Sequence, residues 1–305
     1  MMEKIRAFLS KEAVLVVAAL AAVTSCALVP FDEGYASYVD WRTLALLFCL
    51  MAVVTGLRFM GVMRLLGSWA VSRASSVRAL AFALVALTFV SSMAVTNDVA
   101  LITFVPLALV VLAEAGESRF TASVVVLMTV SANLGSMLLP VGNPQNLFLY
   151  RVSGMDFFQF ALIMAPVVAL SAVMLVAAVL IVFRGNAEGL SYRASCKALP
   201  KPTGRQGLMF VSYLLLFVLS VMAVVGFIDA FAVAILVAFV LLFLDRRSLA
   251  KVDYGLLLTF VALFVFVGNM ARVPAVHEAL SALVGIAPFC AAVGSSQVIS
   301  NVPAA

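Results

Sequence analysis

The stretch LAFALVALTFVSSMAVTNDVALITFVPLALVVL, which runs from Leu80 to Leu112, decides the class of fold. It contains two apolar arms of roughly 15 residues each, close to the roughly 20 residues with which a helix crosses a lipid bilayer. Asn97 and Asp98 separate the two arms. An amide and a carboxylate deep in the lipid bilayer are costly in free energy unless they bind something. The stretch therefore predicts a helical membrane hairpin with a functional tip.

The composition of the whole chain also indicates a membrane protein. Of 305 residues, 65% are apolar and 11% are charged, whereas a soluble domain carries about 25% charged residues. The mean hydropathy is +1.21. Because so few charges cannot cover a globule, a soluble enzyme, a nucleic-acid-binding module and a disordered chain are excluded. We expect an all-α polytopic membrane protein that is not an enzyme.

Further apolar blocks follow one another along the chain with short breaks. The blocks run from Ala13 to Val29, Thr43 to Leu57, Leu80 to Val95, Val99 to Leu112, Phe120 to Leu139, Phe157 to Phe183, Leu208 to Phe227, Phe231 to Leu244, Leu256 to Met270 and Leu280 to Val293. Several are shorter than the roughly 20 residues that span a bilayer. Short blocks are typical of transporters with re-entrant hairpins and broken helices, whose freed backbone groups face a cavity or other protein.

The basic residues gather in loops, so topology explains the net charge of +5 better than a nucleic-acid partner does. Cytoplasmic loops of membrane proteins carry the excess of Lys and Arg. The N-terminal tail, the stretches 58–78 and 184–205, and the segment DRRSLAK (245–251) are therefore predicted to be cytoplasmic. The connection 30–40 contains no Lys or Arg and is predicted to lie outside. The basic tail resembles a secretory signal, but a retained first membrane helix is favoured because a polytopic chain follows.

Two pairs of similar segments indicate an internal repeat. VDWRTLALLFCLMAVVTGL (Val39 to Leu57) aligns without gaps to VDYGLLLTFVALFVFVGNM (Val252 to Met270), and SSMAVTN (Ser91 to Asn97) matches SSQVISN (Ser295 to Asn301). Two matches in the same order support a repeat. Because the first copy begins outside and the second begins at a cytoplasmic segment, the repeats are predicted to be inverted. Inverted repeats place a substrate and its coupling ion near the middle of the membrane.

The repeats divide the chain into four predicted parts. These are a tail, first helix and external loop (1–38), the first transport repeat (39–183), a basic cytoplasmic loop with a linking hairpin (184–251), and the start of the second repeat (252–305). Beyond Asn97 the first copy continues for on the order of 85 residues, whereas the sequence ends four residues after Asn301. We therefore expect a second repeat that is truncated at its C-terminal end.

The residues at the predicted hairpin tip are the first candidates for binding. Asn97 offers a carbonyl oxygen and Asp98 a charge, which suit a hard cation such as sodium, or a proton. The alternative is that both residues turn the chain at a water-exposed hairpin and cap a helix that starts at Val99. The recurrence of Asn301 in the second matching segment favours binding.

A second polar stretch, SANLGSMLLPVGNPQN (Ser131 to Asn146), ends an apolar block. Its glycines, Gly135 and Gly142, permit close approach of the backbone to a ligand, and its prolines interrupt a helix. A helix broken near Asn133 or Gly142 would expose carbonyl groups to a cation and N-terminal amides to an anion. The alternative is an ordinary external loop, but four amide side chains within fourteen residues argue against it.

Together the two polar stretches resemble those of a known family. TNDVALITFVPLAL followed at this spacing by SANLGSMLLPVGNPQN resembles the ion transporter superfamily, and in particular its citrate-transporter-like permeases. These permeases group with divalent anion:sodium symporters and arsenite-pump membrane subunits, and the bacterial anion-permease branch is the most similar. The resemblance is strong over residues 40–183 and weak over residues 253–305. It implies a secondary transporter with scaffold and transport domains, often a homodimer that moves its site by an elevator-like shift.

The resemblance also implies where the binding residues lie. In that family a Ser/Thr-Asn-Thr-like signature occupies the tip of each re-entrant hairpin, and here Thr96-Asn97-Asp98 and Ser300-Asn301-Val302 occupy those positions. Asp98 replaces a neutral residue of the dicarboxylate symporters and resembles the Asn-Asp pair of the arsenite and sodium/proton branches. Val302 has no side-chain oxygen, so the second site is expected to differ from the first.

Two sets of residues follow as predicted binding sites. The predicted cation site consists of Thr96, Asn97, Asp98, Asn133 and Gly135. The predicted substrate-binding residues are Asn143, Asn146, Ser300 and Asn301. No metal site beyond sodium at Asn97 is expected, and no cofactor other than that ion. The four cysteines have no paired spacing and are expected to be free thiols.

We expect a secondary transporter of the bacterial inner membrane with a cytoplasmic N-terminus. It would move a small solute, with an anion favoured, coupled to sodium or protons, and it would have no nucleic-acid partner. One alternative is a cation/proton antiporter or arsenite-type efflux permease in which Asp98 carries the proton. Another is an inactive, truncated membrane scaffold.

Arg58 and Arg272, each near the end of a repeat's first helix, can attract an anion or extend to the membrane interface.

Overall fold

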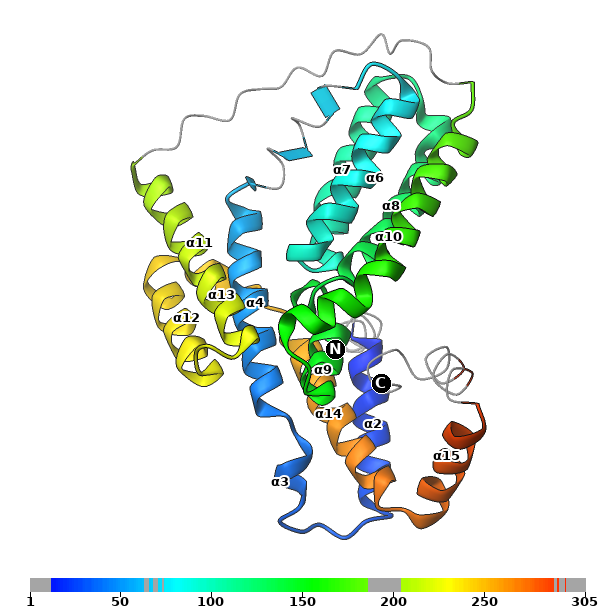
Figure 1. Cartoon of the computed structure of the whole chain (residues 1–305). Coiled ribbons are helices and arrows are strands. Elements are labelled where there is room, and N and C mark those ends of the chain that lie inside the picture. The colour runs from blue at the N-terminus through cyan, green and yellow to red at the C-terminus, as the bar shows by residue number, and fades with distance from the viewer. Residues whose placement is uncertain are drawn as a thin grey trace, which may run out of the picture. The chain divides into compact units, whose positions relative to one another are not determined.

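The computed structural model describes residues 12–62, 66–67, 71–72, 74–185, 204–287, 290 and 294. Over these ranges the chain is helical and contains no β-strand (Figure 1). This confirms the predicted all-α class. Two of the predicted substrate-binding residues, Ser300 and Asn301, lie outside the described residues.

Among the described residues, six helices are long and apolar enough to cross a membrane. They are α4 (Trp41–Phe59), α6 (Val77–Ala94), α7 (Asn97–Glu114), α10 (Phe157–Val182), α11 (Gly204–Val225) and α14 (Tyr254–Ala271). Two further apolar helices are shorter, namely α2 (Ala13–Cys26) and α12 (Ala230–Leu244). These helices agree with the prediction of a multi-pass membrane protein. The predicted sidedness of the loops stays a prediction.

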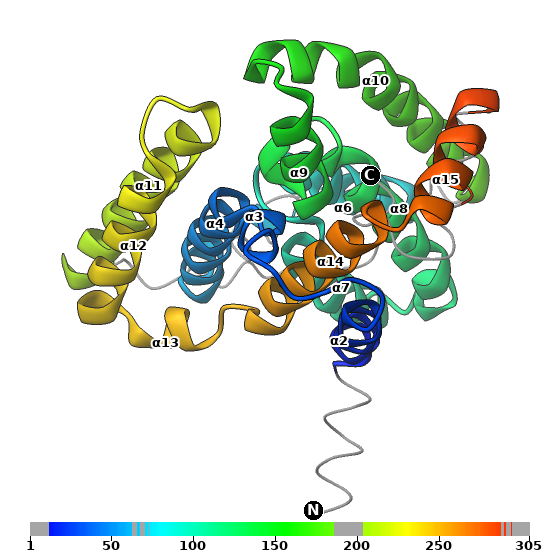
Figure 2. The same cartoon turned by 90° about the horizontal axis from the view of Figure 1, so that it is seen from below.

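The chain divides into two compact units. Unit 1 comprises Met1–Phe48 and Val252–Ala305, and unit 2 comprises Cys49–Lys251, so that the boundary crosses α4. In unit 1, α2 packs along α14, as both views of the molecule show (Figures 1 and 2). The short helix α3 (Tyr35–Tyr38) and the helix α15 (Pro274–Ile286) also contact α14.

A glycine and a buried asparagine permit the close packing around α14. A Cβ atom at Gly268 would overlap the ring of Tyr38, so a larger residue cannot occupy this position without displacing α3. The next residue, Asn269, is fully buried and donates its side-chain amide to the hydroxyl oxygen of Ser25 at 2.9 Å. A buried amide bonded across two helices fixes their relative register.

An ion pair closes the end of unit 1 beyond α14. Arg272 donates to both carboxylate oxygens of Asp32, at 2.6 and 3.0 Å, and to the hydroxyl oxygen of Tyr38 at 2.8 Å. The hydrogen bond from Arg272 lowers the pKa of the Asp32 carboxyl, and the same bond raises the pKa of Arg272. Arg272 is therefore engaged within the chain, by a residue 240 positions away in sequence.

The two helices aligned by the predicted repeat begin in the same way. Asp40 accepts a hydrogen bond from the backbone N–H of Thr43 at the start of α4, at 3.0 Å. Asp253 accepts one from the backbone N–H of Leu256 at the start of α14, at 2.9 Å. An aspartate in this position caps a helix. The inversion of the repeats and the four predicted domain boundaries stay predictions.

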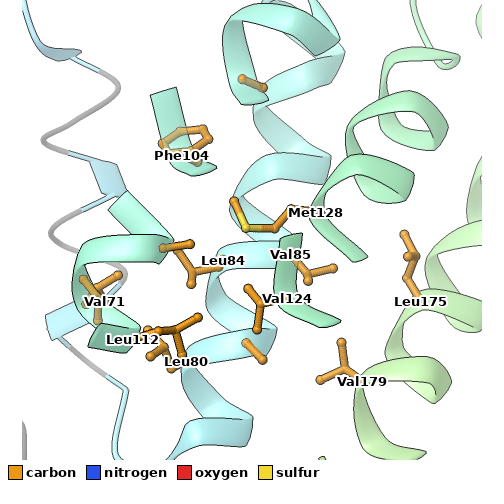
Figure 3. Close-up of a cluster of buried hydrophobic side chains, with 14 of the residues drawn as sticks. Val71, Leu80, Leu84, Val85, Phe104, Leu112, Val124, Met128, Leu175 and Val179 are labelled. Atoms are coloured by element: carbon orange, nitrogen blue, oxygen red, sulfur yellow. The ribbon is translucent and has the colours of Figure 1, made fainter. Parts of the chain in front are cut away.

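In unit 2, the helices α6, α7, α8 (Thr121–Ser136) and α10 pack around one hydrophobic cluster (Figure 3). Its labelled members include Leu80, Leu84 and Val85 of α6, Phe104 and Leu112 of α7, Val124 and Met128 of α8, and Leu175 and Val179 of α10. In lipid the removal of water drives helix association little, so close van der Waals contact must hold these helices together.

Two interruptions of the helices in unit 2 define the places where polar groups can gather. Val95 and Thr96 join α6 to α7, which form the predicted helix pair. The re-entrant character of this pair stays a prediction. After η1 (Ser118–Phe120) and α8, the chain passes through η2 (Pro140–Gly142) into α9 (Pro144–Ser153). The helix is thus interrupted within the stretch where the sequence predicts a break.

Candidate functional site

The tip between α6 and α7 brings two helix ends of opposite polarity together. α6 ends at Ala94, and α7 begins at Asn97 with Thr96 as its N-cap residue. The last carbonyl groups of a helix and its first N–H groups lack partners within the helix, and they carry partial negative and positive charge respectively. The tip therefore offers groups that attract a cation and groups that attract an anion.

A hydrogen bond joins this tip to α8. Asn97 donates its side-chain amide to Oδ1 of Asn133 at 3.1 Å, and Asn133 donates its own amide to the carbonyl oxygen of Thr129 at 2.9 Å. Among the described residues, no donor bonds Oδ1 of Asn97. The structure thus brings together two predicted cation-site residues that lie 36 positions apart. The side-chain carbonyl oxygen of Asn97 is therefore available to bind a cation.

The other two polar residues of the tip flank Asn97. The side chain of Thr96 makes no capping bond to α7, although it occupies the N-cap position. Asp98 lies in the first turn of α7 and is exposed, where its charge interacts favourably with the positive end of the helix. Because α7 starts at Asn97 and not at Val99, Asn97 and Asp98 are the first two residues of the helix rather than its cap.

Gly135, predicted to bind a cation, lies in the contact between α8 and α6. A Cβ atom here would lie 2.6 Å from the hydroxyl oxygen of Ser92 and 2.9 Å from the carbonyl carbon of Phe89, and closer still to the Phe89 oxygen. The carbonyl oxygen of Gly135 accepts from the backbone N–H of Leu138 at 3.2 Å. In this structure Gly135 therefore sets the approach of two helices, and through it the distance between Asn97 and its partner. Its direct contact with a cation stays a prediction.

Asn143 and Asn146, predicted to bind substrate, are buried and hold the break between α8 and α9. Asn143 accepts the backbone N–H of Asn146 at 2.7 Å, which caps α9, and donates to the hydroxyl oxygen of Ser136 at 3.0 Å. Asn146 donates to the carbonyl oxygens of Met137 at 2.7 Å and Ser136 at 3.2 Å. These bonds satisfy carbonyl groups that the end of α8 leaves unpaired. A contact of either asparagine with substrate stays a prediction.

Ser136 links the break to the candidate cation site, although it is not among the residues that the sequence predicts to bind. Its hydroxyl donates to the carbonyl oxygen of Asn133 at 2.9 Å and accepts the bond from Asn143. A Cβ atom at Gly142 would lie 2.9 Å from the carbonyl carbon of Ser136, so the break closes tightly around this residue. In the sequence, the position of Ser136 between Gly135 and the predicted break could have identified it as a candidate.

The sequence of the whole chain matches that of a known transporter family. The sequence model described as citrate transporter (CitMHS) matches residues 1–305. The chain belongs to the citrate transporter family. This member is 31% identical over 281 residues to the inner membrane protein YbiR of Escherichia coli (strain K12), over 90% of this chain and 73% of YbiR. The family confirms the predicted resemblance and a membrane transporter as the class of protein.

Two further relatives of this citrate transporter family member are named as transporters. An uncharacterized transporter of Methanocaldococcus jannaschii is 28% identical over 273 residues, which cover 87% of this chain and 70% of that protein. The silicon efflux transporter LSI3 of Oryza sativa subsp. japonica is 35% identical over 136 residues, which cover 44% of this chain and 27% of LSI3.

Proposed function

We propose that this member of the citrate transporter family is a secondary active transporter of a small anion, coupled to sodium ions or protons. The observation that carries the proposal is the hydrogen bond of 3.1 Å between Asn97 and Asn133, which orients a carbonyl oxygen at the tip between α6 and α7. The bacterial inner membrane is the proposed location, in keeping with the name of the relative YbiR.

The tip offers chemistry for both the ion and the anion. Three consecutive residues, Thr96, Asn97 and Asp98, carry side-chain oxygens, and hard cations prefer oxygen ligands. The first backbone N–H groups of α7 suit an anion. An anion and a cation bound side by side lower each other's cost in a medium of low dielectric constant. Binding of one then raises the affinity for the other, and this mutual effect is the coupling that a symporter needs.

Further contacts complete this proposal. Asn143 and Asn146 would contact the anion from the break between α8 and α9, and Ser300 and Asn301 would contribute a second half-site. The homodimer implied by the family resemblance also belongs to the proposal.

A second candidate function is efflux driven by protons. Asp98 favours it, because an exposed carboxylate in the first turn of α7 is a group that can carry a proton. The similarity to a plant protein named as a silicon efflux transporter also favours it. In this case Asp98 would bind the driving ion, and Asn97 would position the transported solute.

Uptake into liposomes that contain the purified protein tests the main proposal. A panel of radiolabelled anions is offered under an inward sodium gradient or an inward proton gradient. Asn97→Ala should abolish the gradient-dependent uptake without preventing insertion, because it removes both the oxygen ligand and the bond to Asn133. The control Thr24→Val removes a hydroxyl that bonds within α2 and should leave uptake unchanged. Sodium- and proton-dependent uptake at the wild-type rate in Asn97→Ala would exclude the proposed site.

Asp98→Asn distinguishes the two functions in the same liposomes. A proton-driven efflux permease should lose its pH-dependent exchange, because the amide cannot carry a proton. A sodium symporter should keep part of its sodium-dependent uptake, because an amide oxygen can still bind sodium. If both activities survive unchanged, Asp98 serves neither role.

A further inference from the structure

Unit 2 contains a second polar region, separate from the tip of α6 and α7. A pocket of about 380 Å³ is lined by Arg58, Phe59, Ile102, Thr103 and Arg247. Its lining comes from three elements, the end of α4, the middle of α7 and the short helix α13 (Arg246–Ala250). Thr103 lies six residues after the start of α7, which is about 9 Å along the helix. The pocket thus shares α7 with the candidate cation site but none of its residues.

Two arginine side chains line this pocket without neutralisation from the described part of the chain. Neither Arg58 nor Arg247 forms an ion pair with a described carboxylate. The guanidinium carbon of Arg247 lies 4.7 Å from the centre of the Phe59 ring. Stacking on an aromatic ring holds a guanidinium group in place while the N–H donors at its edge stay available.

The acidic residue closest in sequence to Arg247 is occupied elsewhere. Asp245 accepts hydrogen bonds from the hydroxyl groups of Tyr213 at 2.8 Å and Ser248 at 2.7 Å, and from the backbone N–H of Arg247 at 3.1 Å. Burial tends to raise the pKa of Asp245, but the hydrogen bonds from the hydroxyl groups of Ser248 and Tyr213 and from the backbone N–H groups of Ser248 and Arg247 together outweigh it, and the pKa is lowered. The carboxylate therefore anchors α13 to α11 and does not cancel the charge of the guanidinium groups.

The packing of α11 against α4 places the two arginines on the same pocket. A Cβ atom at Gly56 would overlap the ring of Tyr213, so the two helices meet closely just before Arg58. The same tyrosine holds Asp245, which precedes Arg247 by two residues. Arg58 and Arg247 are thus brought to one pocket by the contacts of a single buried side chain.

Two guanidinium groups that no described carboxylate pairs with line one pocket, and they are complementary to an oxyanion. Guanidinium groups bind phosphate and carboxylate oxygens through paired hydrogen bonds, and the volume is within the usual range for small-ligand sites. The hydroxyl of Thr103 donates to the carbonyl oxygen of Val99 at 2.8 Å, so among the side chains described as lining the pocket the guanidinium groups are the remaining donors. We propose that this pocket binds an oxyanion such as a phosphate group, either from a soluble anion or from the headgroup of an anionic phospholipid.

The proposal joins three elements of unit 2. An oxyanion bound by both arginines would link the end of α4 and α13, and it would contact α7, which carries Asn97 at its start. Both arginines belong to segments that the sequence predicts to be cytoplasmic, where lipid headgroups and soluble anions are within reach.

Binding measurements on the full chain in detergent test this proposal. The thermal unfolding midpoint is followed during titration with inorganic phosphate, and separately with phosphatidylglycerol in phosphatidylcholine micelles, because a ligand of the folded state raises the midpoint. Arg58→Gln and Arg247→Gln should each weaken binding at least tenfold. The matched control is Arg246→Gln, whose side chain bonds the carbonyl oxygen of Leu242 at 2.9 Å and does not line the pocket. It should bind as the wild type does.

Each outcome of the two titrations decides the proposal. Arginine-dependent binding of inorganic phosphate supports a soluble anion, and arginine-dependent binding of phosphatidylglycerol alone supports a lipid headgroup. The proposal is overturned if the wild type binds neither probe, or if both pocket variants bind them with wild-type affinity. It is equally overturned if Arg246→Gln weakens binding as much as the pocket variants do.

Discussion

Replacing Gly135 by alanine should separate α8 from α6. The new Cβ atom would lie 2.9 Å from the carbonyl carbon of Phe89 and closer still to the Phe89 oxygen, so relief requires more than the 0.5 Å that separates 2.9 Å from the 3.4 Å at which ordinary contacts begin. The contact is with backbone, so a rotation of a side chain cannot relieve it. Overpacking of this kind costs roughly 1 to 3 kcal/mol, and the higher helix propensity of alanine offsets up to about 1 kcal/mol. Because the nearest atom is a backbone oxygen, the upper part of this cost range applies, and we expect a net loss of about 1 to 3 kcal/mol.

The same displacement should reach the candidate cation site. If α8 moves away from the tip by at least 0.5 Å, the bond of 3.1 Å between Asn97 and Asn133 lengthens to about 3.6 Å or more, which is beyond a hydrogen bond. Gly135→Ala should therefore weaken ion-dependent uptake as well as stability, although it changes no polar group.

Reversible unfolding in mixed micelles and uptake into liposomes measure the two effects. The matched control is Gly207→Ala in α11, because a Cβ atom there meets nothing within 4 Å. Gly207→Ala should keep wild-type uptake and should gain up to about 1 kcal/mol of stability. Wild-type stability together with wild-type uptake in Gly135→Ala would show that the close approach of α8 to α6 does not position the site.

Two further predictions concern the break and unit 1. Asn143→Ala should lower the free energy of unfolding by roughly 2 to 4 kcal/mol, because it removes the cap of α9, leaves the N–H of Asn146 without its acceptor and deprives the hydroxyl oxygen of Ser136 of its donor. An unchanged unfolding midpoint in micelles would contradict this. Asp32→Asn should lower the thermal midpoint at pH 7, where the bond from Arg272 holds the pKa of Asp32 below its ordinary value of 3.8. The stabilisation is present above pH 3.8 and is lost as the pH falls through the lowered pKa, so the midpoints of wild type and variant should converge in acid. A difference that is independent of pH would refute the role of the ion pair.

The membrane-spanning helices could be predicted because the apolar residues that indicate each helix follow one another in the sequence. The apolar arms from Leu80 and from Val99 predict α6 and α7 to within a few residues. The predicted and observed helices differ at the ends of the helices. α7 starts two residues before Val99, because Asn97 and Asp98 begin its first turn, where the unpaired backbone N–H groups are donors that polar side chains tolerate well.

The contacts that build the site were less predictable because they depend on which helix faces meet. The sequence singled out Asn97 and Asn133 separately, and the structure joins them by one hydrogen bond. The hydrogen bonds of Asn143 across the break could not be read from composition, because its acceptor, Ser136, lies seven positions earlier across an irregular segment. The pair formed by Arg58 and Arg247 depends on the packing of Tyr213, which no local periodicity reveals.

A double-mutant comparison of uptake is the most direct test of an ion site formed by Asn97 and Asn133. Liposomes containing wild type, Asn97→Ala, Asn133→Ala or both changes are supplied with one transported anion under matched sodium and proton gradients. If the two side chains form one site, each single variant should lose the gradient-dependent uptake, and the double variant should be no worse than either. Gradient-dependent uptake at the wild-type rate in both single variants would contradict the proposed site.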